Sequence, residues 1–167
     1  MTELRTERLL LRRWRDSDRK PFFLVNSDPR VMEFYPRPFT RRESDEVMDR
    51  YEKSFKEKGF GRFAVERCSD HAFMGMIGLA IATHPTQREA FIDFGWRLSP
   101  DFWGQGFATE GAREVVKHAF EDLKLDALVA LAAEANMRSR RVMEKLNMTH
   151  DPADDFDEPK FPVGHRA

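Results

Sequence analysis

The sequence has few of the features that mark disulfide-rich, nucleic-acid-binding or membrane-spanning proteins. Its 167 residues include one cysteine, Cys68, so we expect neither an internal disulfide nor a multi-cysteine metal cluster. Lys and Arg number 28 against 29 Asp and Glu, so the basic excess that neutralises nucleic-acid phosphates is missing. The longest apolar run, 73–82, is too short to span a bilayer. Charged residues near the N-terminus, in place of an apolar signal segment, favour a cytoplasmic protein with no nucleic-acid or membrane partner.

Apolar periodicity predicts a single domain, 1–167, with elements in the order βααβββαβα. Strands are expected over 8–14, around Phe63 and Val65, and over 73–81, 90–98 and 126–133, the last of them buried. Helices are expected up to about Val25, between the capping residue Thr40 and Gly59, over the apolar stripe 112–123, and from Asn136 onward. This order implies an α/β or α+β domain with a mixed, mostly antiparallel sheet and helices on both faces.

A glycine-bearing loop, WGQGFAT, lies between the expected strand 90–98 and the helix that follows it. It consists of Trp103, Gly104, Gln105, Gly106, Phe107, Ala108 and Thr109. Glycines let a backbone approach a ligand closely. The first turn of a helix also has unpaired N–H groups and the positive end of the helix dipole. Such a loop binds phosphate or pyrophosphate without a basic side chain.

Several interpretations of this loop compete. A P-loop requires Lys after the second glycine, and none follows Gly106. A dinucleotide-binding fingerprint needs glycine or alanine three residues after Gly106, where Thr109 stands, so an oxidoreductase that binds NAD is a weaker alternative. A glycine turn that only joins strand to helix is a further alternative. The pyrophosphate loop of an acyl-CoA transferase fits the strand before the loop and the helix after it.

Two longer stretches carry a family resemblance. The stretch 98–111, LSPDFWGQGFATEG, resembles the acyl-CoA loop of the GNAT N-acetyltransferase superfamily in its RimJ/RimL-type branch. The stretch 135–148, ANMRSRRVMEKLNM, resembles the family helix that begins Asn-x-x-Ser. The opening TERLLLRRW and the tail DDFDEP look like the same branch. The resemblance implies the GNAT acyl-CoA N-acyltransferase fold, with acetyl-CoA as cosubstrate and an amine as acceptor.

The resemblance also assigns roles to single residues. The backbone N–H groups of 105–109 would bind the CoA pyrophosphate. The strand end Trp96, Arg97 and Leu98 would run beside the pantetheine arm. Asn136 would hydrogen-bond the pantetheine or its strand, and Ser139 would lie near the CoA sulfur. Relatives continue into a last strand, whereas this sequence stops at 164–167, so we expect that final strand to be absent.

The chemistry requires a base, because an amine attacks only when it is neutral. Asp93 is our candidate because it lies in the apolar strand, where burial would raise its pKa. The alternative is a structural carboxylate paired with an arginine, and Glu134 is a second candidate base. Ser139 would hydrogen-bond the leaving thiolate, or else a carbonyl of the preceding helical turn. The five histidines have no ligand spacing, so no metal is expected.

We therefore expect an N-acetyltransferase that acts in a ternary complex on a protein N-terminus or a small-molecule amine. A non-catalytic CoA-binding or regulatory module is the alternative, favoured by Met143, which stands where many relatives carry a proton-donating tyrosine. Trp14, Phe34 and Tyr35 are expected in the core or at the acceptor pocket, and the acidic run 154–158 at a solvated face or near a cationic acceptor. An exposed sheet edge would favour a homodimer.

Overall fold

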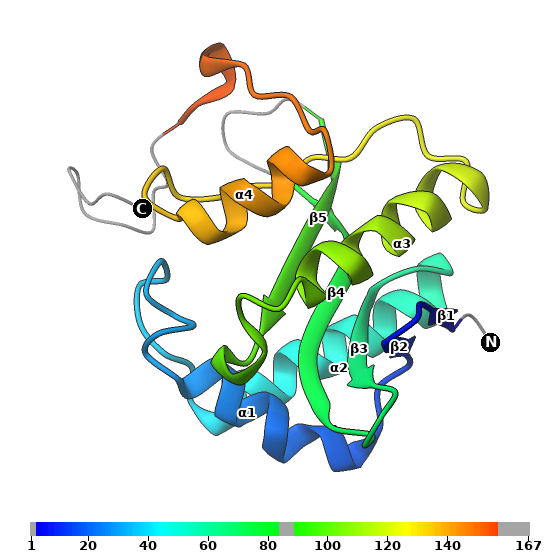
Figure 1. The fold of residues 1–167 in the computed structure, drawn as a ribbon, viewed down its shortest axis with the longest axis vertical. Helices are drawn as coiled ribbons and strands as arrows, with labels where there is room; N and C mark the ends of the chain where they lie inside the picture. Colours follow the sequence, from blue (N-terminus) through cyan, green and yellow to red (C-terminus); the bar gives the residue numbers. More distant parts are fainter. Residues whose placement is uncertain (1–2, 84–88, 157–167) are drawn as a thin grey trace.

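The computed structural model describes residues 3–83 and 89–156 (Figure 1). Its sheet has five strands in the order β1-β2-β3-β4-β5, and each neighbouring pair is antiparallel. The strands are β1 (Leu4–Arg5), β2 (Leu9–Arg12), β3 (Arg62–Arg67), β4 (Phe73–Ala82) and β5 (Phe91–Leu98). The first predicted strand is thus shorter than expected and pairs with an additional short strand, β1.

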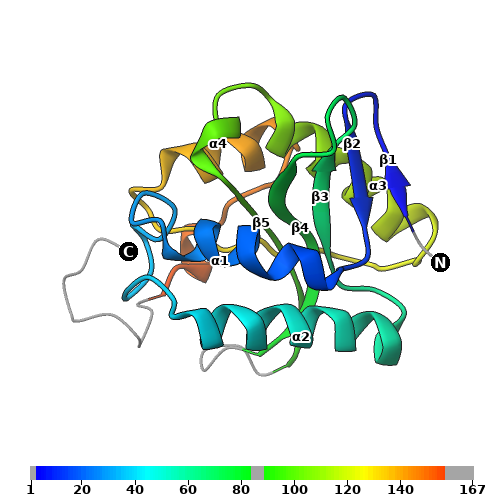
Figure 2. The same ribbon diagram turned by 90° about the horizontal axis from the view of Figure 1, so that it is seen from below.

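Helices cover both faces of this sheet, as predicted. Figure 2 shows α1 and α2 on one side of the strands and α3 and α4 on the other. Their bounds are α1 (Arg19–Ser27), α2 (Arg41–Lys58), α3 (Phe107–Glu121) and α4 (Met137–Lys145), with short 3-10 turns η1 (Asp16–Asp18), η2 (Pro100–Phe102) and η3 (Pro152–Asp154). None of the helices in 3–83 and 89–156 is both long and apolar enough to cross a membrane.

Local signals set the ends of α2 where the sequence predicts them. The Thr40 hydroxyl accepts a hydrogen bond from the Glu43 amide, and the Glu43 carboxylate accepts one from the Thr40 amide. This reciprocal pair satisfies two N–H groups that the first helical turn leaves free. At the other end Gly59 has a φ of 80°, a left-handed conformation that glycine adopts without strain. The capping prediction is confirmed.

The buried strand predicted over 126–133 is wrong. This segment makes one isolated parallel bridge, between Asp93 and Val129, and Val129 and Leu131 are exposed. The Phe94 amide donates to the Val129 carbonyl over 2.7 Å, and the Val129 amide donates to the Ile92 carbonyl over 2.9 Å. In the described part of the chain, the segment forms no strand pairing beyond this bridge. The end of the acidic run 154–158 and the chain end at 164–167 fall outside the described residues.

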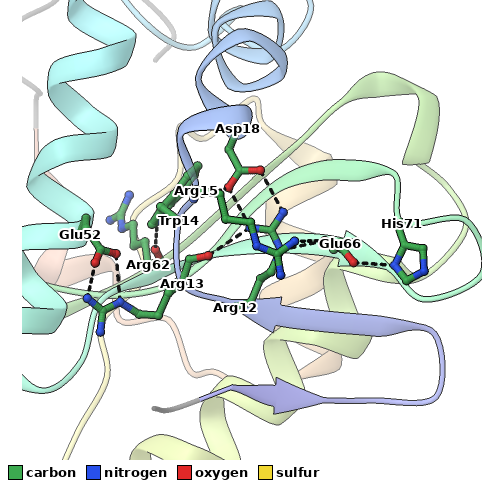
Figure 3. Close-up of polar contacts among 9 residues, drawn as sticks. All are labelled: Arg12, Arg13, Trp14, Arg15, Asp18, Glu52, Arg62, Glu66 and His71. Carbon is green, nitrogen blue, oxygen red and sulfur yellow. Dashed lines mark hydrogen bonds and ion pairs between the residues drawn. The ribbon is translucent and has the colours of Figure 1, made fainter.

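A cluster of buried charged side chains connects β2 to η1 and β3 (Figure 3). Arg12 is 4% exposed and forms two hydrogen bonds with Asp18, of 2.7 and 2.9 Å. Its Nε donates to Glu66 of β3 over 2.7 Å, and His71 contacts the other oxygen of Glu66. The Arg12 guanidinium therefore pairs with two buried carboxylates and connects η1 to the sheet, while Arg15 adds a longer contact of 3.4 Å to Glu66.

Candidate active site

The loop between β5 and α3 has the backbone that its glycines predict. Gly104 and Gly106 have φ values of 73° and 84°, a region that residues with a Cβ rarely adopt. Gly106 is the N-cap of α3, and none of the described side chains caps that helix end. The first backbone bond of the helix is donated by Glu110 to Gly106, so the amides of 107–109 have no acceptor within the helix. The helix start thus presents free N–H groups to an anion.

Side chains of the loop hold its shape and leave the backbone available. The Trp103 indole donates to the Leu98 carbonyl over 2.9 Å, and the Gln105 amide donates to the Asp101 carbonyl over 2.9 Å. Phe107 is 5% exposed and packs into the core. Ligand contacts of these residues are therefore expected from backbone groups more than from side chains.

A groove of about 590 Å³ lies beside the start of α3, and sequence reasoning missed most of its lining. Arg8 supports the loop there: it donates to the Gln105 carbonyl over 3.2 Å and pairs with Glu110 at 2.6 Å. Thr6 and the Arg8 amide also bind Glu110. The groove is lined by Thr6, Glu7, Arg8, Gly106, Thr109, Glu110, Arg113, Glu114 and Lys145. More than 100 residues separate Arg8 from Glu110, so no local pattern in the sequence predicts this contact.

The outer edge of β5 is open near its end. Phe94 and Ile92 direct their backbone groups away from β4, toward Val129. Because these groups alternate in direction along a strand, those of Trp96 and Leu98 also face away from β4. Beyond the single bridge at Val129, no strand of the described residues pairs with this edge. The amides of Trp96 and Leu98 therefore lie at an open edge next to the glycine loop.

Helix α4 brings Asn136 and Ser139 together. The Asn136 Oδ1 accepts a hydrogen bond from the Ser139 amide over 3.1 Å, which makes Asn136 the N-cap. Within 3–83 and 89–156, neither the Asn136 Nδ2 nor the Ser139 Oγ has a hydrogen-bond partner. The carbonyl contact considered for Ser139 is thus not formed, and both polar atoms remain available to a ligand. Arg138 of the same turn stacks on Trp103, with 4.3 Å to the ring centroid.

Asp93 forms a partly buried ion pair with Arg62 of β3. Burial raises the pKa of the Asp93 carboxyl, and the attraction of Arg62 offsets this effect only in part. Asp93 is thus both a carboxylate paired with an arginine and a group with the raised pKa expected of a base. Glu134, the second candidate, is exposed in the turn before α4.

The remaining predicted residues lie apart from one another. Trp14 is 8% exposed and belongs to the core, where its indole donates to the Arg62 carbonyl. Tyr35, by contrast, is 40% exposed in the segment between α1 and α2. In the described part of the chain no group of three His, Cys, Asp or Glu side chains is arranged to hold a metal.

A family model described as an acetyltransferase (GNAT) domain matches residues 8–149. The chain belongs to the GNAT acetyltransferase family. The FsC-acetyl coenzyme A-N(2)-transacetylase of Aspergillus fumigatus is 35% identical over 133 residues, which are 75% of this chain and 56% of that protein. The chain therefore spans little more than half the length of this relative.

Solved structures of GNAT acetyltransferases share the fold. An acetyltransferase from Agrobacterium tumefaciens is 27% identical and covers 96% of this chain and 91% of its own, with a TM-score of 0.81. A spermidine N-acetyltransferase from Vibrio cholerae, solved with CoA and spermine, is 23% identical and has a TM-score of 0.65. That likeness covers 84% of this chain and 80% of the other, and it supports the fold alone.

Proposed function

We propose that this GNAT protein is an N-acetyltransferase in which acetyl-CoA and an amine bind together and react directly. The observation that carries the proposal is the uncapped, glycine-initiated start of α3, next to the free edge of β5. The amides of 107–109 fit a pyrophosphate, since a helix start stabilises anions through its N–H groups and its dipole. The amides of Trp96 and Leu98 fit a pantetheine arm that runs along β5. The helix start and the open strand edge are the two features expected from the resemblance of the sequence to the RimJ/RimL-type branch.

The reaction needs the removal of one proton and the stabilisation of two charges. The acceptor nitrogen forms a bond to the acetyl carbon, the carbon–sulfur bond breaks, and the amine loses a proton. An amide of the 96–98 edge donates to the carbonyl oxygen as negative charge develops there. Asp93 accepts the proton from the amine, directly or through one water. The Ser139 hydroxyl donates to the departing thiolate, which is a good leaving group because its ordinary pKa is about 8.5.

Asp93 is tested by the pH dependence of kcat/KM. The raised pKa of a base predicts a rate that increases with pH through that pKa, because only the carboxylate accepts a proton. D93N removes this limb and lowers kcat/KM, whereas the titration of the acceptor amine remains. E134Q is the matched control, because it neutralises the other candidate carboxylate. A D93N profile that coincides with the wild-type profile would exclude Asp93 as the base.

A non-catalytic CoA-binding module is the second candidate. Met143 favours it, because this half-buried residue of α4 cannot donate a proton. Calorimetry with acetyl-CoA, with NAD as the control ligand, tests the binding role that both candidates share. Thiol release across amines, from peptide N-termini to polyamines, then separates them. Binding without release for every amine would favour the module, and binding of NAD alone would refute both candidates.

A further inference from the structure

Beside Asp93, the α1–α2 face of β5 carries two arginine side chains, Arg62 and Arg97, to which the proposed acetyl transfer assigns no role. Side chains alternate along a strand, so Asp93, Gly95 and Arg97 share one face of β5. The Cα atom of Gly95 lies about 7 Å from that of Asp93 and about 7 Å from that of Arg97. A Cβ built on Gly95 would lie 3.2 Å from Nη2 of Arg62. The missing side chain of Gly95 therefore makes room for this guanidinium between Asp93 and Arg97.

Arg62 and Arg97 have different partners. Arg62 pairs with Asp93, donates to the Tyr51 hydroxyl over 3.4 Å and lies over its ring. Arg97 is 8% exposed, and its Nη1 donates to the neutral amide oxygen of Asn26 over 2.6 Å. Within 3–83 and 89–156, the Nε atoms of Arg97 and of Arg62 are both buried without a hydrogen-bond partner. Among the described residues no carboxylate forms an ion pair with Arg97.

The cluster therefore has two cations and one carboxylate. Its outer side is formed by Tyr35 and Phe39, whose ring centroids lie 4.6 and 5.4 Å from the Arg97 guanidinium carbon. Burial raises the pKa of the Tyr35 phenol, but Arg97 and then Arg62 lower it by more, so the pKa falls below its ordinary value. The excess of positive charge thus reaches the phenol oxygen. Tyr35 is 40% exposed, whereas Arg97 next to it is 8% exposed, so a ligand would reach the guanidinium where the Tyr35 side chain meets solvent.

We infer that the acceptor is a small amine that also carries a carboxylate, of the amino acid class, and that Arg97 binds this carboxylate beside the hydroxyl of Tyr35. The inference rests on the proposed function, since it concerns the acceptor of that same site. A guanidinium matches a planar carboxylate, and an ion with one charge balances the unpaired cation. Arg97 lies between Trp96 and Leu98, whose amides face the proposed thioester. A carboxylate bound by Arg97 would therefore lie close to the amine that attacks the thioester. This closeness indicates that the two groups belong to one small molecule. The same excess of positive charge disfavours a polyamine.

Matched pairs of acceptors test the inference on the wild-type protein. L-amino acids and their carboxamides share the amine and the side chain, and they differ in the anionic group. Thiol release from acetyl-CoA, measured for each pair and for spermidine, is expected to give at least one amino acid a kcat/KM tenfold or more above its amide. The inference is overturned if amides or spermidine are accepted as well as the acids.

Variants of Arg97 locate the effect. R97Q removes the charge and is expected to raise KM for the acid and bring the ratio of acid to amide close to one. R97K retains the charge and is expected to keep part of the preference. R42Q is the matched control, because Arg42 has a side chain that is 86% exposed on α2. An unchanged ratio of acid to amide in R97Q would overturn the inference. If R97Q does not fold, Y35F replaces it, and this variant should weaken the preference for the acid several-fold.

Binding separates a failure of this inference from a failure of the proposed function. Calorimetric titration of the amino acids and their amides into the protein saturated with CoA requires no turnover. Binding of an acid but not of its amide supports the inference even if no thiol is released, in which case only the transferase proposal fails. Acetylation of other amines without binding of any amino acid overturns the inference and leaves the transferase proposal in place.

Discussion

Substitution of Gly106 provides a direct test of the anion site at the start of α3. The residue has a φ of 84°, so most side chains would strain the loop. Asn and Asp tolerate this conformation better than other residues and have the same size. G106N therefore reports the cost of adding a side chain, and G106D reports that cost together with one negative charge.

The expected effect of the charge follows from Coulomb's law. A carboxylate at position 106 would lie about 5 Å from an anion held by the amides of 107–109, which costs about 2–3 kcal/mol per unit charge at a local dielectric constant near 20–30. This corresponds to a roughly 30- to 150-fold weaker affinity for acetyl-CoA in G106D than in G106N. Arg8 offsets part of the penalty, because its Nη2 lies 3.6 Å from the position of a Cβ at residue 106. It is already paired with Glu110, so the offset is incomplete.

Calorimetry with acetyl-CoA at low and high salt measures this difference. The gap between G106D and G106N should shrink at high salt, because the Debye length falls from about 30 Å at 0.01 M to about 3 Å at 1 M. Wild-type affinity in both variants would refute the assignment of the loop. Equal losses in G106D and G106N would mean that the glycine serves the backbone conformation and that no phosphate lies nearby.

Two further predictions concern stability and titration. R12A removes the buried guanidinium that pairs with Asp18 and Glu66 and leaves Glu66 with the longer 3.4 Å contact to the exposed Arg15. We expect a loss of about 3–5 kcal/mol, measured by urea unfolding at pH 7. A loss below about 1 kcal/mol would contradict this prediction. The Glu43 carboxyl should titrate by NMR with a pKa of about 2, because Arg37 and then the Thr40 amide stabilise its charged form. A lowered pKa stabilises the fold above the ordinary value of 4.5, and this contribution is lost as the pH falls toward 2. R37Q should raise the Glu43 pKa toward 4.5.

Local signals made the glycine loop and α2 predictable. The capping box and Gly59 act within a few residues of the helix ends they define, so the sequence contains the whole cause. The glycine loop is similar, because its shape depends on the backbone conformation of Gly104 and Gly106. The segment 126–133 has strand-like residues, but a strand also depends on the partner it pairs with, and periodicity carries no information about that partner.

The acceptor side of the site was harder to predict because distant parts of the chain build it. An arginine partner for Asp93 is a reasonable expectation for any buried carboxylate, but Arg62 is 31 residues away, and nothing in the sequence identifies it. Arg97 was predicted for its backbone, as part of a strand beside the cofactor. In the structure its distinctive feature is the side chain, which Asn26 holds across 71 residues.

The two alternating sets of residues at the end of β5 show how one strand would serve both proposed ligands. Even-numbered residues direct their amides to the open edge, where the cofactor is proposed, while Asp93 and Arg97 direct their side chains to the face that carries the acceptor cluster. The cofactor side depends on backbone groups and therefore tolerates sequence change. The acceptor side depends on side chains, so single substitutions there can alter the substrate without disturbing the binding of CoA. Acceptor preference and CoA affinity should therefore vary independently among variants of 93 and 97.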